Sequence, residues 1–233
     1  MKRLAIIPAR GGSKRIPNKN IKNFLGKPMI SYIVDTALDS KLFEKIHVST
    51  DSLRIKRTVE DYKLKVDFLR PKELSDDKTP IMPVLKFVTE NYKKIGYKFD
   101  QIWLLMACSP LVTPGDLISA DRTYQSYNPK TKLMSVSRYP APIEWAYTKN
   151  QKGILKAVKK GAFQVPSQEF EITYYDTGNF CIFSQTDILS SVAAGEGENF
   201  LPYEIPFFRG LDIDGLDDWI MAEQLYTALK NEY

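Results

Sequence analysis

Histidine and cysteine are scarce in this chain of 233 residues, which holds one histidine, His47, and two cysteines, Cys108 and Cys181. Two distant cysteines are too few for a disulfide framework or a zinc site, and we predict that both are reduced, buried thiols. His47 lies in the run KIHVST, which is typical of a strand. We therefore expect a structural role for His47 and a mechanism that needs no histidine base.

Long apolar runs are missing as well. No stretch approaches the roughly 20 residues of a membrane-spanning helix. The apolar residues 4–8 are too short for a signal peptide, and they lead into a proline and an arginine. The content of 43% hydrophobic and 26% charged residues is that of a globular protein. The sequence therefore predicts a cytoplasmic protein with no membrane partner.

Acidic residues are absent before Asp35, although residues 1–34 carry eight cations. Nucleic-acid-binding proteins spread such charge along a stripe with aromatic or helical reading elements. Here much of it is concentrated in one loop, residues 10–20, directly after an apolar run. This distribution favours a compact polyanion such as a triphosphate over nucleic acid or an anionic membrane surface. The cations of this loop are Arg10, Lys14, Arg15 and Lys19.

Strand-like apolar runs alternate with helix-like segments through the first two-thirds of the chain. This pattern predicts an α/β, Rossmann-like fold with a mainly parallel sheet and helices on both faces. Ligands of such sheets bind beyond the carboxyl ends of the strands, so the loops 10–20, 50–52 and 109–111 are expected to converge. The expected strands are 3–9, 45–50, 65–69, 101–108, 179–183 and, at an edge, 202–208. The expected helices are 28–40, 52–62, 80–95, 113–127 (with Thr113 as N-cap), 185–194 and 215–233.

Residues 138–178 break this rhythm, because they are rich in aromatics, prolines and turn residues. We interpret them as β-hairpin material that projects from the sheet and serves as an interaction arm. The whole chain, residues 1–233, is then one domain with an inserted arm.

The loop after the first strand has the composition of a phosphate-binding loop, although neither G-x-x-x-x-G-K-[ST] nor G-x-G-x-x-G is present. Gly11 and Gly12 allow main-chain N–H groups to approach an anion, and Ser13 can donate its hydroxyl. Arg10, Lys14 and Lys19 can neutralise phosphate oxygens, the arginine as a fork and the lysines as point charges. The alternative is a solvated basic turn.

A pair of carboxylates, Asp212 and Asp214, stands in the segment LDIDGLDDW. On an extended backbone this spacing places both on one face. Close carboxylates repel, and a divalent cation relieves the repulsion. Mg²⁺ accepts one or two carboxylates together with phosphate oxygens. The alternative is that they cap the following helix, in whose first turn Asp217 and Asp218 are expected.

Two further polar groups follow expected strands. Asp51 either meets a nucleotide or second metal, or caps its own loop. Arg70 either binds an anion or forms a surface ion pair with Glu73.

The ordered segments PARGGSKRIPNKNIK, GKPMI, VSTDS, RPKEL, SPLV and LDIDGLDDW resemble the acylneuraminate cytidylyltransferase family, the CMP-sialic acid synthetases, over nearly the whole chain. FLRPKELSDDKT, RYPAPIEWAY and YYDTGNF are most similar to its pseudaminic acid branch. The resemblance implies a nucleotidyltransferase in which a nine-carbon keto sugar acid attacks CTP and releases pyrophosphate, for surface glycan or flagellin glycosylation. Synthesis of CMP-N-acetylneuraminic or CMP-legionaminic acid, a sugar-1-phosphate nucleotidyltransferase, and a catalytically silent nucleotide-binding regulatory protein are the alternatives.

The resemblance also implies roles for individual residues. Arg10, Lys19 and Asp214 would be catalytic, and Asp212 with Asp214 would bind Mg²⁺, or Mn²⁺ in its place. The arm of one subunit would reach the sugar site of a second in a homodimer. The nucleotide-binding residues implied are Ala9, Arg10, Gly11, Gly12, Ser13, Asn20, Arg70 and Asp77.

One segment departs from the family pattern. After the central strand the chain reads LLMACSPLV, where sialic acid enzymes read LLQPTSPLR. Met106 thus stands in place of a glutamine and Val112 in place of an arginine, and we expect both near the site. The lower polarity favours a deoxy, diacetamido sugar acid over sialic acid.

Overall fold

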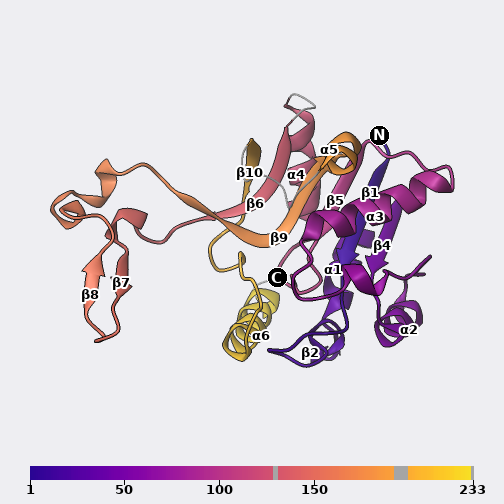
Figure 1. Cartoon of the computed structure of the whole chain (residues 1–233), viewed down its shortest axis with the longest axis horizontal. Helices are drawn as coiled ribbons and strands as arrows, with labels where there is room; N and C mark the ends of the chain where they lie inside the picture. Colours follow the sequence, from indigo (N-terminus) through magenta and orange to yellow (C-terminus); the bar gives the residue numbers. More distant parts are fainter. Residues whose placement is uncertain (128–130, 192–198, 232–233) are drawn as a thin grey trace.

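A six-stranded sheet forms the centre of the computed structural model, which describes residues 1–127, 131–191 and 199–231. Five strands run parallel, and β9 runs antiparallel between its two neighbours, so the prediction of a mainly parallel sheet is confirmed (Figure 1). In spatial order the strands are β10 (Phe200–Glu204), β6 (Lys132–Arg138), β9 (Tyr174–Ser184), β5 (Gln101–Leu105), β1 (Arg3–Pro8) and β4 (Lys45–Ser49).

Helices cover both faces of this sheet. One face packs against α1 (Ile30–Ser40), α2 (Leu53–Tyr62) and α4 (Pro114–Gln125). The other face packs against α3 (Ile81–Lys94) and α5 (Gln185–Ser190). None of the described helices combines the length and the hydropathy that a membrane span needs.

The start signals read from the sequence set the positions of two helices. Thr113 and Asp116 form a reciprocal capping box at the first turn of α4, and Pro114 occupies the first helical position. The hydroxyl of Ser52 accepts a hydrogen bond from the backbone N–H of Ile55 at the start of α2. Both caps fix the loops that leave the carboxyl edge of the sheet.

The prediction of a strand at residues 65–69 is wrong, because this segment forms no ladder with β4. Its backbone is held by other groups: the N–H of Val66 donates to the carboxylate of Glu60 at 3.2 Å. The carboxylate of Asp67 turns inward and lies 2.8 Å from the ammonium of Lys45. These side-chain contacts hold the segment near β4 without a backbone ladder.

Strand β6 was not anticipated from the sequence, because serines interrupt its apolar residues. Both serines are buried and hydrogen-bonded. Ser135 Oγ accepts a hydrogen bond from Thr177 at 2.8 Å, and Ser137 Oγ donates to the carbonyl of Ile205 at 2.6 Å. Of the predicted edge strand 202–208, residues 202–204 belong to β10, which lies at the sheet edge, and residues 205–208 form no strand. Residues 192–194 of the predicted helix 185–194 lie outside the described residues.

The predicted arm projects from the sheet, as Figure 1 shows. Its far end is an antiparallel hairpin of β7 (Tyr147–Lys149) and β8 (Leu155–Ala157). Trp145 and Phe163 stack beneath this hairpin with ring centroids 5.8 Å apart. Several large apolar side chains of the arm are nevertheless exposed to solvent, namely those of Tyr147, Ile154, Leu155, Val158 and Phe163.

The closing segment of the chain forms α6 (Leu216–Asn231), which packs beside the small hairpin of β2 (Asn23–Phe24) and β3 (Lys27–Pro28). The rings of Phe24 and Trp219 meet edge to face at 5.3 Å. This third core anchors α6 below the carboxyl edge of the sheet.

Both cysteines are unpaired, as predicted. Burial raises the pKa of the Cys108 thiol and of the Cys181 thiol to about 12 in each case. Both thiols therefore stay protonated at neutral pH, and neither is a nucleophile there.

The structural role predicted for His47 is confirmed by its surroundings. The imidazole is fully buried in β4, stacks on Phe68 with ring centroids 4.3 Å apart, and its Nδ1 lies 3.1 Å from the hydroxyl of Tyr92. Its Nε2 is buried without a hydrogen-bond partner among the described residues. Burial lowers the pKa of His47 from 6.5 to about 4.

We therefore expect the protein to lose stability as the pH falls from 6.5 towards 4. In this window the unfolded chain binds a proton that the folded chain excludes, so the free energy of unfolding decreases, by about 3 kcal/mol in total. Urea unfolding at pH 4.5 and 7 measures the loss. The variant His47→Phe keeps the stacking and cannot titrate, so its loss should be smaller. An equal loss in both proteins would contradict the assignment.

Candidate active site

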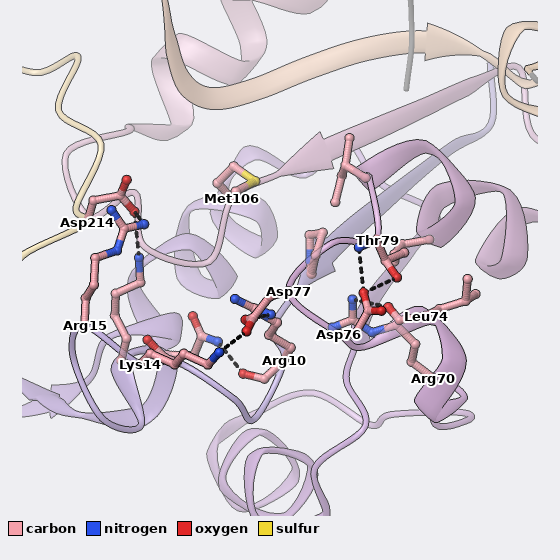
Figure 2. A pocket seen from close by; sticks show the side chains of 16 residues that line it. Arg10, Lys14, Arg15, Arg70, Leu74, Asp76, Asp77, Thr79, Met106 and Asp214 are labelled. Atoms are coloured by element: carbon pink, nitrogen blue, oxygen red, sulfur yellow. Dashed lines mark hydrogen bonds and ion pairs between the residues drawn. The ribbon is translucent and has the colours of Figure 1, made fainter. Parts of the chain in front are cut away.

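A cleft of about 540 Å³ opens beyond the carboxyl ends of β1 and β5 (Figure 2). Apolar side chains, including Met106, form one wall. The remainder is polar or charged, with cations outnumbering carboxylates, so the cleft is suited to an anionic ligand. The cations that line it are Arg10, Lys14, Arg15, Lys19 and Arg70, and the acids are Asp76, Asp77 and Asp214.

Two of the three loops expected to converge, 10–20 and 50–52, meet beside this cleft. The third, residues 109–111, does not line it, because Pro110 and Leu111 line a separate pocket. The backbone N–H of Ala9 donates to the carbonyl of Ser49 at 2.9 Å, and that of Gly11 donates to the carboxylate of Asp51 at 3.0 Å. A Cβ at position 11 would lie 3.2 Å from the Cβ of Ser52. Glycine therefore allows the loop to approach the start of α2, and Asp51 braces that loop.

A tight turn directs the second half of the loop back to the sheet. Asn18 adopts the left-handed conformation, with φ 55°, which asparagine tolerates better than most residues. The short helix η1 (Lys19–Ile21) follows. The buried amide of Asn20 donates to the carbonyl of Arg10 at 3.1 Å and accepts from the thiol of Cys108 at 3.4 Å. The loop is thus fastened to itself and to the end of β5.

The segment that carries the carboxylate pair reaches the cleft through a close backbone contact at Gly210. A Cβ on this residue would overlap the hydroxyl of Ser137 and the methyl group of Thr177. The backbone can therefore lie directly against β6 and β9 only with glycine here. Beyond this contact the amide of Asn179 donates to the carbonyl of Leu211 at 3.5 Å.

The basic loop and the carboxylate segment meet across the cleft (Figure 2). The ammonium of Lys19 donates to the carbonyl of Ile213 and lies 3.6 Å from the carboxylate of Asp214. The guanidinium of Arg15 lies 2.8 Å from the same carboxylate. Two segments almost 200 residues apart therefore build one site.

Neither Asp212 nor Asp214 caps α6. That role belongs to Asp218, whose carboxylate accepts the backbone N–H groups of Asp214 and Gly215 at 3.0 and 2.7 Å. Asp217 and Asp218 occupy the first turn of the helix, as predicted. The carboxylate pair is therefore not used in capping, although Asp214 is already paired with Arg15 and Lys19.

The environment of Asp212 suits a cation. The surrounding protein partly screens its carboxyl from water although the side chain keeps solvent contact, and the Asp214 carboxylate is close, so both effects raise the pKa of Asp212. Within the described residues, no cluster of three or more histidine, cysteine, aspartate or glutamate side chains could hold a metal. Two carboxylates completed by phosphate oxygens match the usual coordination of Mg²⁺.

Arg70 closes the opposite side of the cleft. It is only 6% exposed, and its guanidinium donates to the carbonyls of Ser49 at 3.0 Å and Leu74 at 3.4 Å, with Nε left without a partner among the described residues. Burial lowers the pKa of Arg70, but an arginine remains charged at neutral pH. The surface ion pair with Glu73, considered from the sequence, is not formed.

Asp77 pairs with two cations of the basic loop. One carboxylate oxygen lies 2.5 Å from Arg10, and the other contacts Lys14. Hydrogen bonds from Lys14 and Arg10 lower the pKa of Asp77, so it is ionised at neutral pH.

Most of the predicted site residues lie in the cleft lining, namely Arg10, Ser13, Lys19, Asn20, Arg70, Asp77 and Asp214. The others, Ala9, Gly11, Gly12 and Asp212, adjoin these in the same two segments. Met106 also lines the cleft, as expected. No role was predicted for Arg15 from the sequence. Its position in the basic loop was the feature that pointed to the site.

The expectation that Val112 lies near the site is wrong. Its side chain is 4% exposed and belongs to the core under α1 and α4. Its carbonyl accepts a hydrogen bond from the hydroxyl of Thr36 at 3.0 Å. An apolar residue at this position serves packing.

Comparison with known proteins agrees with this geometry. A family model described as cytidylyltransferase matches residues 4–113. The fold resembles a solved structure of CMP:2-keto-3-deoxy-manno-octonic acid synthetase complexed with CTP, with a TM-score of 0.74, 17% identity and complete coverage of both chains. Fold and family match together define a nucleotidyltransferase.

Two relatives show which kind of nucleotidyltransferase this chain is similar to. The pseudaminic acid cytidylyltransferase of Campylobacter jejuni is 34% identical over 98% of this chain and 97% of its own length. The CMP-N,N'-diacetyllegionaminic acid synthase of Legionella pneumophila is 29% identical over 97% of this chain and 96% of its own length. The chain belongs to the cytidylyltransferase family.

Proposed function

We propose that the protein activates a nonulosonic acid with CTP, giving a CMP-sugar and pyrophosphate, and that pseudaminic acid is its sugar. The observation that carries the reaction is the meeting of the basic loop with the Asp212–Asp214 segment across one cleft. The sugar is supported by the full-length similarity to a pseudaminic acid enzyme. Met106 supports it as well, because a thioether in the cleft suits a sugar acid with fewer hydroxyl groups than sialic acid.

Asp212 and Asp214 are the residues that would hold Mg²⁺. Their mutual repulsion and their position beside the phosphate-binding cations fit such an ion. When bound there, Mg²⁺ neutralises phosphate charge and lowers the pKa of an attacking hydroxyl.

The protein's own groups supply positioning and charge, which are the main needs of nucleotidyl transfer. Arg10, Lys14 and Lys19 bind the triphosphate and stabilise the negative charge that develops on the departing pyrophosphate. Arg70 lines the cleft, and its positive charge attracts the nucleotide phosphates. The sugar C2 oxygen bonds to the α-phosphorus as the bond to the β-phosphate oxygen breaks, and the hydroxyl proton passes to water.

The arm is the part of the chain that we propose to meet a second copy in a homodimer. Its exposed apolar side chains form a contact surface beyond the sheet. In such a homodimer, the arm of each subunit would contribute to the sugar site of the other subunit.

Pyrophosphate release with purified substrates tests the proposed function. Pseudaminic, legionaminic and N-acetylneuraminic acids are each combined with CTP, UTP or GTP in the presence of Mg²⁺. We expect the highest kcat/KM with CTP and pseudaminic acid. The variant Asp214→Asn should lose nearly all pyrophosphate release with this pair. Preference for another sugar would refute the substrate, and no release with any pair would favour a silent nucleotide-binding protein.

A further inference from the structure

The cations of the phosphate-binding loop are already paired with carboxylates of the protein itself. On one side of the cleft, Asp77 contacts both Arg10 and Lys14. On the other side, Asp214 faces Arg15 and Lys19. A polyphosphate bound at Arg10 and Lys14 would therefore compete with the Asp77 carboxylate, which lies beside them (Figure 2).

The segment that carries Asp77 has a defined shape. It links the short helix η2 (Lys72–Leu74) to α3. The carboxylate of Asp76 accepts the backbone N–H groups of Lys78 at 3.0 Å and Thr79 at 2.6 Å. Asp76 thus holds the turn, and the neighbouring Asp77 is free to project towards the loop.

The pairs made by Asp77 are accessible to solvent. The side chains of Asp77, Arg10 and Lys14 are 41%, 36% and 79% exposed. Ion pairs in such surroundings are weak, because water screens the charges. They can offset part of the loop's positive charge in the nucleotide-free protein and still yield to a ligand of higher charge.

We propose that Asp77 is a displaceable substitute for the polyphosphate and a determinant of anion specificity. Pyrophosphate and the triphosphate expel its carboxylate from Arg10 and Lys14, whereas an anion of low charge competes poorly with it. The apparent affinity for a phosphate ligand is then lowered by the fraction of protein in which Asp77 is paired. The inference rests on the proposed function, because it assigns the phosphates to this loop.

The variant Asp77→Asn tests this competition by calorimetric titration with pyrophosphate and with cytidine. Loss of the competing charge should tighten pyrophosphate binding by about 3- to 10-fold, the equivalent of one or two exposed ion pairs. Cytidine carries no phosphate, so its affinity should change less than about twofold. Asp39→Asn is the matched control, because Asp39 is exposed at the end of α1 and its loss changes the net charge equally.

Four results would overturn the inference. Weaker pyrophosphate binding in Asp77→Asn would make Asp77 a ligand of the nucleotide. Equal tightening for cytidine would indicate a general change of the cleft, and equal tightening in Asp39→Asn would indicate net charge. These titrations contain no sugar acid, so a wrong substrate leaves them interpretable. If the unaltered protein binds CTP but Asp77→Asn does not bind pyrophosphate more tightly than the unaltered protein, the inference is refuted and the proposed function still stands.

Discussion

The variant Asp214→Asn is expected to lose turnover by about 10³-fold or more while it keeps the fold. The amide preserves the size of the side chain but removes the charge that holds a divalent cation, and such an ion contributes several kcal/mol to the stabilisation of the transition state. Asparagine also leaves Arg15 and Lys19 without their present counter-charge. Pyrophosphate release at saturating CTP and Mg²⁺ measures the effect on kcat.

Asp217→Asn is the matched control for this experiment. Asp217 lies in the first turn of α6, three residues further along the chain, and is exposed outside the cleft lining. Its replacement should leave kcat near that of the unaltered protein. Thermal unfolding of both variants separates a catalytic defect from an unfolded protein. Near-normal rates of Asp214→Asn at saturating Mg²⁺ would show that the metal assignment is wrong.

The variant Lys19→Ala should lower kcat by about 10²- to 10³-fold, because a preorganised donor to developing charge contributes on this scale. The ammonium is held in place by the carbonyl of Ile213 and the carboxylate of Asp214, and its side chain is 19% exposed. Little reorganisation is therefore needed when the leaving group becomes charged. Measuring kcat and KM separately distinguishes stabilisation of the transition state from binding of the ground state.

Lys22→Ala provides the comparison for Lys19. Lys22 follows η1 and places its ammonium 4.9 Å from the ring centroid of Trp219, outside the cleft lining. Its loss should change kcat less than about threefold, since exposed cation–π contacts contribute only about 0.5–1 kcal/mol. A loss of tenfold or less in Lys19→Ala would reduce that residue to an ordinary lysine of the loop.

The parallel half of the fold could be predicted because its signals are local. Residues 3–9 and 101–108 are continuous apolar runs, as buried parallel strands require. The start of α4 can be recognised from Thr113, because its capping box involves only the next three residues. Residues 65–69, KVDFL, carry β-branched and aromatic residues typical of a strand, yet side-chain partners on other elements decided their path.

The antiparallel insertion could not be predicted in the same way. β9 pairs with β5 and β6, and the arm lies between β6 and β9 in the chain. The order and direction of these strands depend on long-range packing. The serines of β6 appear polar in the sequence and become acceptable in the core through hydrogen bonds to Thr177 and Ile205.

The candidate site likewise has parts that could be predicted from the sequence and parts that could not. Loop 10–20 and the Asp212–Asp214 pair were identified from their composition, because glycine, cations and paired acids have few other uses in such patterns. The ion pairs of Asp77 with Arg10 and Lys14 join segments more than 60 residues apart, and their geometry depends on the fold. The interior position of Val112 likewise follows from packing beneath two helices.

The eleven-residue strand β9 connects the base of the arm to the wall of the cleft. Its pairing with β6 shifts register between Met134 and Val136, opposite Gly178, which has φ +64° and lies beside Asp212. Residues added at the distal turn between β7 and β8 would only lengthen the arm. One residue added in β9 near Gly178 would turn the neighbouring side chains to the other face of the sheet. Changes in chain length are thus tolerated at the turn between β7 and β8 and are disruptive in β9 at the base of the arm.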